Sequence, residues 1–466
     1  MSLLGRSVVL CVFILAVSAS VTDKILKISL FEVGELWINS VHRLNTRFVD
    51  YVISLCDVYS PLFYVGLAVL AVVGYYLGDI LFRPYNRIVT LGDLGYLPDG
   101  KFTKKEIANS VKRRRAVGDI PPIYPNGWYG VLESWRLKNG GVTTTHLIGI
   151  QLAVFRDEKG NVHAVDAYCP HMGANLGVGG RVSGDCIECP FHGWKFRGDD
   201  GKCTHIPYSD KVPEVANIKS YTTMELNGWV YMWFHAEGAE PTWTPMELEE
   251  ITSGEWQYKG RTEHYINSHI EEIPENGADV FHLIQVHQPF IAAGYDLTQM
   301  WSKYFNWGKH NWTASWSQMP KPEEHIGEIK LTHDLSLFGI SLPFVKLNVH
   351  AFQIGPAIVY LKFESFFGRG VFIQSLTPTE PLVQKLVHNI YIHWSVPNFI
   401  AKFFMYGECV QVERDIMIWN NKTYAAKPVF AKSKEDSLIA RHRRWYSMFY
   451  SKNSPRLTFQ KNDMDW

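Results

Sequence analysis

The chain has 466 residues, of which 46% are hydrophobic and 14% aromatic, and it carries 46 Lys+Arg against 46 Asp+Glu. This much buriable surface excludes a disordered chain, and the zero net charge argues against a nucleic-acid partner, because a phosphate backbone requires a basic surface. The 7 cysteines are too few for a disulfide-dense secreted scaffold.

Two uncharged segments near the N-terminus predict membrane targeting. The first lies within residues 1–22 and is typical of a signal peptide or a short hydrophobic anchor. The second, residues 58–82, has no charge between Asp57 and Asp79. About 20 apolar residues are enough to cross a hydrocarbon core about 30 Å thick, so this stretch predicts a transmembrane helix, although a buried core helix has a similar composition.

Residues 83–125 follow as a basic linker, whose excess of Lys and Arg favours the cytosolic side of a membrane. The same orientation results if residues 1–22 are cleaved or if they form a first span. We therefore expect a membrane protein whose chain after residue 82 lies in the cytosol. The membrane is expected to be that of the endoplasmic reticulum.

Residues 126–236 are typical of a small antiparallel β domain. Short β-prone runs alternate there with turn formers, and Asn227-Gly228 between two such runs is a strong β-hairpin signal.

This β domain contains two pairs of potential metal ligands. Cys169 and His171 are spaced C-x-H, and Cys189 and His192 are spaced C-x2-H. Two thiolates and two imidazoles suit either a tetrahedral zinc ion or a Rieske 2Fe–2S cluster. The C-x-H spacing is too tight for the usual zinc-finger pairing, so the pattern favours the cluster. We expect the remaining cysteines of the downstream chain to be ordinary buried thiols: Cys186, Cys203 and Cys409.

A second metal motif follows in residues 237–466. Asp279, His282 and His287 form D-x2-H-x4-H, and two imidazoles with one carboxylate are the facial triad of non-haem Fe(II) oxygenases. Asp415 is the candidate for that carboxylate, with Glu413 as the alternative. Asp279 is expected to orient a ligand imidazole and to link the two metal centres.

With both motifs present, residues 126–466 resemble the catalytic subunits of Rieske non-haem iron oxygenases. The flanks Cys169-Pro-His-Met-Gly-Ala and Cys189-Pro-Phe-His-Gly-Trp resemble the two cluster loops of that family, and the N-terminal anchor resembles Neverland-type cholesterol 7-desaturases. The resemblance implies an α+β chain with a Rieske domain over 126–236. A helix-grip α/β catalytic domain with mononuclear iron follows over 237–466, and its sheet is expected to include residues 344–349 and 357–361.

The implied function is conversion of cholesterol to 7-dehydrocholesterol with O2, within steroid hormone biosynthesis. The sequence contains no G-x-G-x-x-G strand–helix unit, so the NAD(P)H electrons are expected to arrive from a separate reductase. A homotrimer is also implied. The alternatives are a Rieske hydroxylase or desaturase of another steroid or hydrophobic substrate, including a chlorophyll-breakdown type oxygenase, and an electron-transfer Rieske protein.

Overall fold

The computed structural model describes residues 39–44, 46–47, 49–51, 61–96, 100–114, 120–299 and 304–457. The first expected hydrophobic segment, residues 1–22, lies outside these ranges. The chain divides into two units, Met1–Ile80 and Leu81–Trp466, which are described separately.

Most of helix α3 (Pro61–Phe82) lies in the first unit, and its last two residues belong to the second; the sequence predicts a helix over 58–82. Its stretch Phe63–Phe82 is long and apolar enough to cross a membrane, and none of it is buried in the structure.

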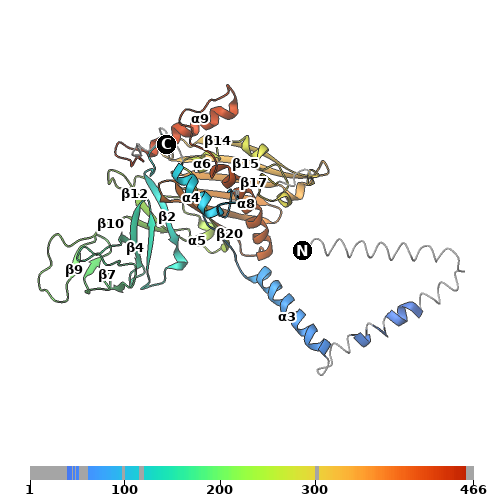
Figure 1. The fold of residues 1–466 in the computed structure, drawn as a ribbon, viewed down its shortest axis with the longest axis horizontal. Helices are drawn as coiled ribbons and strands as arrows, with labels where there is room; N and C mark the ends of the chain where they lie inside the picture. The colour runs from blue at the N-terminus through green and yellow to red at the C-terminus, as the bar shows by residue number, and fades with distance from the viewer. Residues whose placement is uncertain are drawn as a thin grey trace. The chain divides into compact units, whose positions relative to one another are not determined.

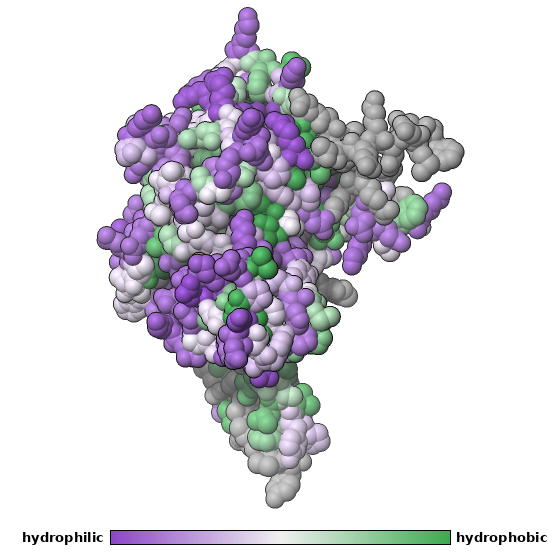
Figure 2. All heavy atoms as spheres, turned by 90° about the vertical axis from the view of Figure 1, so that its left-hand side faces the viewer, coloured by the Kyte–Doolittle hydropathy of each residue, from purple (hydrophilic) through white to green (hydrophobic). Residues whose placement is uncertain are grey.

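The N-terminal part of the second unit consists of small antiparallel sheets, as the sequence predicts. Their strands are β2 (Gly127–Glu133), β3 (Val142–Leu147), β4 (Ile150–Arg156), β5 (Val162–Asp166), β6 (Arg181–Ser183), β7 (Cys186–Glu188), β8 (Lys195–Arg197), β9 (Cys203–His205), β10 (Ser220–Tyr221), β11 (Thr223–Leu226) and β12 (Trp229–Phe234). They pair in the orders β10-β5-β4-β3, β11-β12-β2 and β6-β7-β8-β9. These sheets lie at one end of the second unit (Figure 1), and the surface at that end is mostly hydrophilic (Figure 2).

The hairpin expected at Asn227-Gly228 is confirmed. Strands β11 and β12 are antiparallel on either side of it. Asn227 has a φ of 51° and Gly228 a φ of 78°. Both values lie in the left-handed region that a type I′ turn requires, which is why Asn followed by Gly is favoured there.

The C-terminal part of the second unit is built on a 9-stranded sheet with the main order β1-β13-β20-β19-β18-β17-β15-β14. Its strands are β1 (Tyr85–Val89), β13 (Trp256–Ile266), β14 (Gly308–Gln318), β15 (Ile326–Leu337), β16 (Ile340–Ser341), β17 (Leu347–Ile354), β18 (Ile358–Ser365), β19 (Gly368–Glu380) and β20 (Val383–His393). The accompanying helices are α4 (Lys104–Arg114), α5 (Glu249–Thr252), α6 (Glu272–Glu275), α7 (His282–Gln285), α8 (Asn398–Trp419) and α9 (Lys434–Tyr446). The α+β class expected from the sequence is confirmed.

Two local expectations need correction. Residues 83–125 are more than a linker, because Tyr85–Val89 forms β1 and pairs in parallel with β13 at the edge of the large sheet. Among the residues expected in strands, Phe344 and Val345 belong to a 3-10 turn, Pro343–Val345, and the strand begins only at Leu347. Pro343 explains the second case, since it cannot donate a hydrogen bond to a sheet.

The small sheets pack directly on the large one. Thr377 on β19 donates a hydrogen bond to the carbonyl of Gly130 on β2 at 2.9 Å. A Cβ atom on Gly130 would lie 2.1 Å from Ser375 Oγ, so only glycine allows the two strands to approach this closely. Helix α8 covers one face of the large sheet (Figure 1), and its Val412, Ile416 and Trp419 belong to a buried apolar cluster with Leu376 and Leu386.

Candidate metal centres

The two loops that carry the Cys/His pairs have the same backbone structure. In the first, Cys169 N–H donates to the carbonyl of Ala174 and Gly173 N–H donates back to the carbonyl of Cys169. In the second, Cys189 and Gly193 make the equivalent bonds, with Trp194 in the place of Ala174. The two glycines have φ values of 74° and 73°, a conformation that glycine adopts without strain.

These loops bring the four expected cluster ligands together. Cys169 and Cys189 are buried, and the rings of His171 and His192 lie 4.6 Å apart. The indole of Trp194 stacks on the His171 ring at 4.7 Å and donates a hydrogen bond to Tyr208 Oη at 2.9 Å. The stacking fixes the plane of the His171 ring.

The chemistry of this donor set fits a Rieske cluster. His171 Nδ1 is buried and has no hydrogen-bond partner among the described residues, so it is available to bind a metal. Burial raises the pKa of the Cys169 thiol to about 11, and the adjacent Cys189 adds to the rise. A thiol with this raised pKa ionises at neutral pH only next to a cation, which the iron of the cluster would provide.

The second motif forms a compact group around one point. The nearest ligand atoms of His282, His287 and Asp415 all lie within 4.8 Å of one another. His287 Nε2 is 3.2 Å from Asp415 Oδ1. Two imidazoles and one carboxylate whose ligand atoms converge on one point fit a shared Fe(II) ion.

A hydrogen bond from Nδ1 fixes the orientation of each imidazole ring. His287 Nδ1 donates to Gln411 Oε1 at 2.7 Å, and His282 Nδ1 donates to the backbone carbonyl of Asp279. Each ring therefore presents its Nε2 atom to the metal position. Burial disfavours the charged form of His287, but Asp415 and Gln411 outweigh this effect and raise its pKa.

The loop after His287 is held by a buried arginine. The guanidinium of Arg414 is enclosed and donates to the carbonyls of Gly294 at 3.0 Å, Pro289 at 2.9 Å and Phe290 at 3.1 Å. It also donates to Gln411 Oε1 at 3.2 Å, so one side chain connects helix α8, the loop and the His287 partner.

Asp279 contacts His282 through both its carboxylate and its backbone carbonyl. Its carboxylate accepts a hydrogen bond from the backbone N–H of His282 at 3.2 Å, and its carbonyl receives the His282 ring. The carboxylate thus sits at the first turn of α7 and stabilises the turn that carries the ligand.

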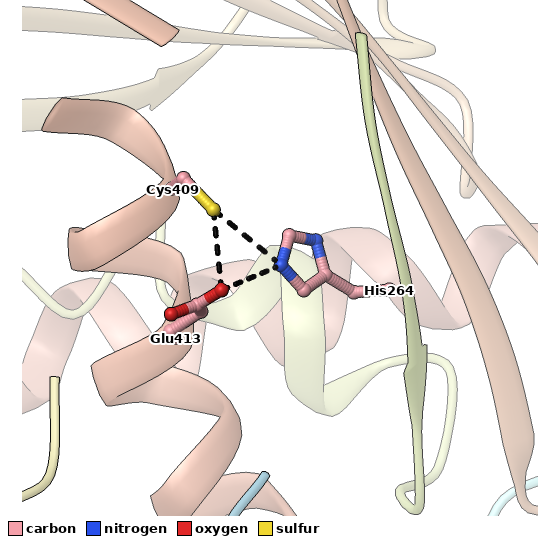
Figure 3. Close-up of side chains that lie close together, drawn as sticks. All are labelled: His264, Cys409 and Glu413. Carbon is pink, nitrogen blue, oxygen red and sulfur yellow. Dashed lines mark hydrogen bonds and ion pairs between the residues drawn. The ribbon is translucent and has the colours of Figure 1, made fainter. Parts of the chain in front are cut away.

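Glu413, the alternative carboxylate, belongs to a different buried cluster (Figure 3). Its Oε1 atom lies 2.6 Å from the Arg87 guanidinium, 3.2 Å from Cys409 Sγ and 3.4 Å from His264 Nε2. Cys409, His264 and Glu413 also meet the distance requirement for a metal site. However, the Arg87 charge already neutralises the carboxylate and opposes a second cation, so the cluster is an ion pair with supporting hydrogen bonds. Cys409 is therefore buried, as expected, but is tied into this network.

The ligand group opens into a mainly apolar cavity. His282, His287 and Asp415 line it, together with residues of the sheet and of α8. The apolar part of the lining includes Leu331, Val349, Leu361, Phe363, Phe372 and Leu386. Apolar walls suit a hydrophobic substrate and keep bulk water away from the metal position.

Several residues of the site were not identified from the sequence. Gln411 and Glu408 precede Asp415 by four and seven residues on α8, which puts all three on one helix face. The spacing would have identified Gln411 and Glu408 if the helix predicted around Asp415 had included the residues back to Asn398. Trp194 ends the quoted flank Cys189-Pro-Phe-His-Gly-Trp, but its stacking on His171 was not predicted. Arg414 had no comparable signal, because the carbonyls that it holds are distant in the sequence.

The chain is similar to known proteins in both of its parts. Residues 127–221 match the Rieske [2Fe-2S] domain family, and residues 232–450 match the 3-ketosteroid 9alpha-hydroxylase C-terminal domain family. It is 52% identical to a cholesterol 7-desaturase of Xenopus laevis over 83% of this chain and 85% of that protein. It is 47% identical to one from Ciona intestinalis over 85% of this chain and 84% of the relative. Among solved structures, NdmB of Pseudomonas putida has the same fold, with a TM-score of 0.51 and 18% identity over 70% of this chain and 93% of NdmB.

Proposed function

Since the chain belongs to the cholesterol 7-desaturase family of Rieske oxygenases, we propose that it converts cholesterol to 7-dehydrocholesterol. The observation that carries the proposal is the combination of two Cys/His loops with a buried group of His282, His287 and Asp415 that faces an apolar cavity. An electron-transfer Rieske protein requires only the first of these features.

Cys169, His171, Cys189 and His192 would hold the 2Fe–2S cluster, and His282, His287 and Asp415 would hold the mononuclear Fe(II). When bound, the cluster supplies single electrons and the mononuclear iron supplies O2 activation. Cholesterol, O2, two electrons and two protons give 7-dehydrocholesterol and two water molecules.

The chain's own residues hold the metal ligands and the substrate in place and keep water out of the cavity. Gln411 and the Asp279 carbonyl fix the two imidazoles, and Arg414 holds the loop behind His287. The apolar lining orients a rigid sterol and excludes water, which supplies the proximity that selective removal of hydrogen at carbons 7 and 8 requires.

The proposal includes a separate reductase that uses NAD(P)H. Met172 and Phe191 lie next to the cluster ligands and are 66% and 60% exposed. Such exposed apolar side chains support docking of a protein partner close to the cluster. We also propose that the chain forms a homotrimer and that α3 anchors it in the endoplasmic reticulum membrane, with the second unit in the cytosol.

The direct test supplies cholesterol, O2, a reductase and NADPH to membranes that contain the chain, with product analysis by mass spectrometry. The wild-type chain should form 7-dehydrocholesterol. His171→Ala should lose the Rieske visible and EPR signals together with activity, whereas His282→Ala should keep those signals and lose the product. Full turnover by either variant would contradict the proposal.

A further inference from the structure

The mainly apolar cavity contains a small polar patch that begins two helical turns before Asp415 on α8. It consists of Gln374 on β19, His388 on β20 and Glu408 on α8, all of which line the cavity. Gln374 and His388 are direct cross-strand partners, so their side chains lie side by side on one face of the sheet. Gln374 Nε2 donates to Glu408 Oε1 at 3.4 Å, which joins the helix to the pair.

His388 lacks a partner within the described protein. It is fully buried, and neither Nδ1 nor Nε2 has a hydrogen-bond partner among the residues that the structure describes. Burial lowers the pKa of His388 to about 3, and nearby His264 adds to the effect. The ring is therefore neutral and offers one donor and one acceptor. Burying both without a partner is unfavourable, so the ring indicates a polar ligand group in the cavity.

The set of hydrogen-bonding atoms suits a hydroxyl group. A hydroxyl donates one hydrogen bond and accepts others. The neutral His388 ring can donate one hydrogen bond and accept one, and the Glu408 carboxyl can accept one. Burial raises the pKa of the partly exposed Glu408 carboxyl to about 7, and Asp415 adds to the rise, while His287 and the hydrogen bond from Gln374 oppose it. Gln374, His388 and Glu408 together offer the donors and acceptors that can hold a neutral alcohol.

The patch also lies at a suitable place along the cavity. Glu408 and Asp415 are seven residues apart on α8, which corresponds to two helical turns on the same face and about 10 Å along the axis. In cholesterol the hydroxyl group and carbon 7 are on adjacent fused rings. A hydroxyl bound at the patch would therefore leave the second ring near the ligand group.

We propose that Gln374, His388 and Glu408 bind the 3-hydroxyl group of the sterol and so determine which carbons face His282, His287 and Asp415. This inference depends on the proposed function for the identity of the sterol. It makes the patch a positioning site, distinct from the groups that hold the metal.

The test is equilibrium binding of cholesterol and of cholest-5-ene, which lacks the hydroxyl, to the detergent-solubilised full chain. The wild-type chain should bind cholesterol about tenfold more tightly, or better, because the analogue leaves the patch unpaired. In Gln374→Leu and His388→Phe this preference should fall below about threefold. His388→Gln keeps a donor and an acceptor and should retain a preference above about fivefold.

Gln353→Leu is the matched control. Gln353 lines the same cavity in the same row across the sheet, but Val359 separates it from Gln374. Its Oε1 accepts a hydrogen bond from His442, whereas its Nε2 is buried without a partner among the described residues, so Gln353 is the competing position for the hydroxyl group. Its loss should leave the sterol preference at the wild-type value. Rieske absorption and iron content show that each variant is folded.

The products provide a second measurement. Gln374→Leu and His388→Phe should yield a larger share of sterols oxidised at positions other than 7 and 8. Equal binding of the two sterols by the wild-type chain, with 7-dehydrocholesterol still formed, would overturn the hydroxyl site and leave the proposed function intact. Preferential binding of cholesterol without any 7-dehydrocholesterol would overturn the function and leave the hydroxyl site intact.

Discussion

At the scale of single residues, two acidic side chains separated by one residue on α8 have different roles. Asp415 faces the two imidazoles, whereas Glu413 faces Arg87, His264 and Cys409. Successive helical residues differ by about 100° in direction, so a separation of two positions is enough to turn a carboxylate away from the cavity. The sequence Glu-Arg-Asp leaves this choice open because it does not specify the orientation of the helix.

Substitution of the two carboxylates separates their roles. Asp415→Asn should lower the mononuclear iron content at least tenfold at equal protein and leave the Rieske absorption unchanged. Glu413→Gln should keep the iron but reduce stability by roughly 1–3 kcal/mol, because Arg87 loses its buried partner. Iron analysis and thermal unfolding measure the two effects, and the reverse pattern would identify Glu413 as the ligand.

Asp279→Asn tests the role of a residue that touches His282 without being placed as a ligand. The backbone carbonyl that holds the His282 ring remains in this variant. We therefore expect bound iron to be retained, while electron transfer from cluster to iron or turnover slows about 10–100-fold. Rapid-mixing spectroscopy of the reduced cluster gives the rate. Complete iron loss would instead make Asp279 a direct ligand.

At the scale of elements, helix α8 organises the catalytic half. One of its faces presents Glu408, Gln411 and Asp415 to the cavity or the ligand group, and Arg414 reaches from it to the loop after His287. Its position on the sheet therefore sets the ligand geometry. The Arg87–Glu413 pair further connects α8 to the edge strand β1.

Arg414→Met should weaken this arrangement. The change leaves several loop carbonyls unpaired and should cost roughly 3–5 kcal/mol. We expect faster loss of mononuclear iron on heating, while the cluster absorption persists to higher temperature. Arg444→Met on the exposed side of α9 serves as the control and should behave like wild type. Equal stability of the two variants would show that Arg414 does not hold the loop.

The local elements of this fold could be predicted from sequence, but several long-range ones could not. Asn227-Gly228 specifies its own turn, and each cluster loop carries its Cys, His and Gly within six residues. By contrast, β1 is a short edge strand whose partner lies far along the chain. His388 looks like any polar residue in a strand until Gln374 and Glu408 are placed beside it.

At the scale of the whole molecule, the second unit contains every proposed metal ligand. It begins at Leu81, and the earliest ligand is Cys169. A chain that starts at Leu81 should therefore be soluble and should assemble both metal sites. Its activity on cholesterol in membranes should fall at least severalfold, because the anchor concentrates the enzyme at the bilayer. A metal-free or aggregated product would show that the first unit is needed for folding.

Membrane orientation has its own test. In sealed microsomes, protease added from outside should digest the second unit of the intact protein, because the basic residues after α3 favour the cytosolic side. Protection of the second unit would place it in the lumen and reverse the proposed topology.

The central claim is desaturation between carbons 7 and 8 of cholesterol, and isotope labelling tests it most directly. The substrate is cholesterol with deuterium at both positions on carbon 7 and at carbon 8, and the oxidant is 18O2. Mass spectrometry of the product shows which labels are lost, kept or gained. The account predicts a product that has lost one deuterium from each carbon, retains one on carbon 7 and contains no 18O. A product that contains 18O and retains the deuterium on carbon 8 would show that the enzyme is a hydroxylase and would contradict the account.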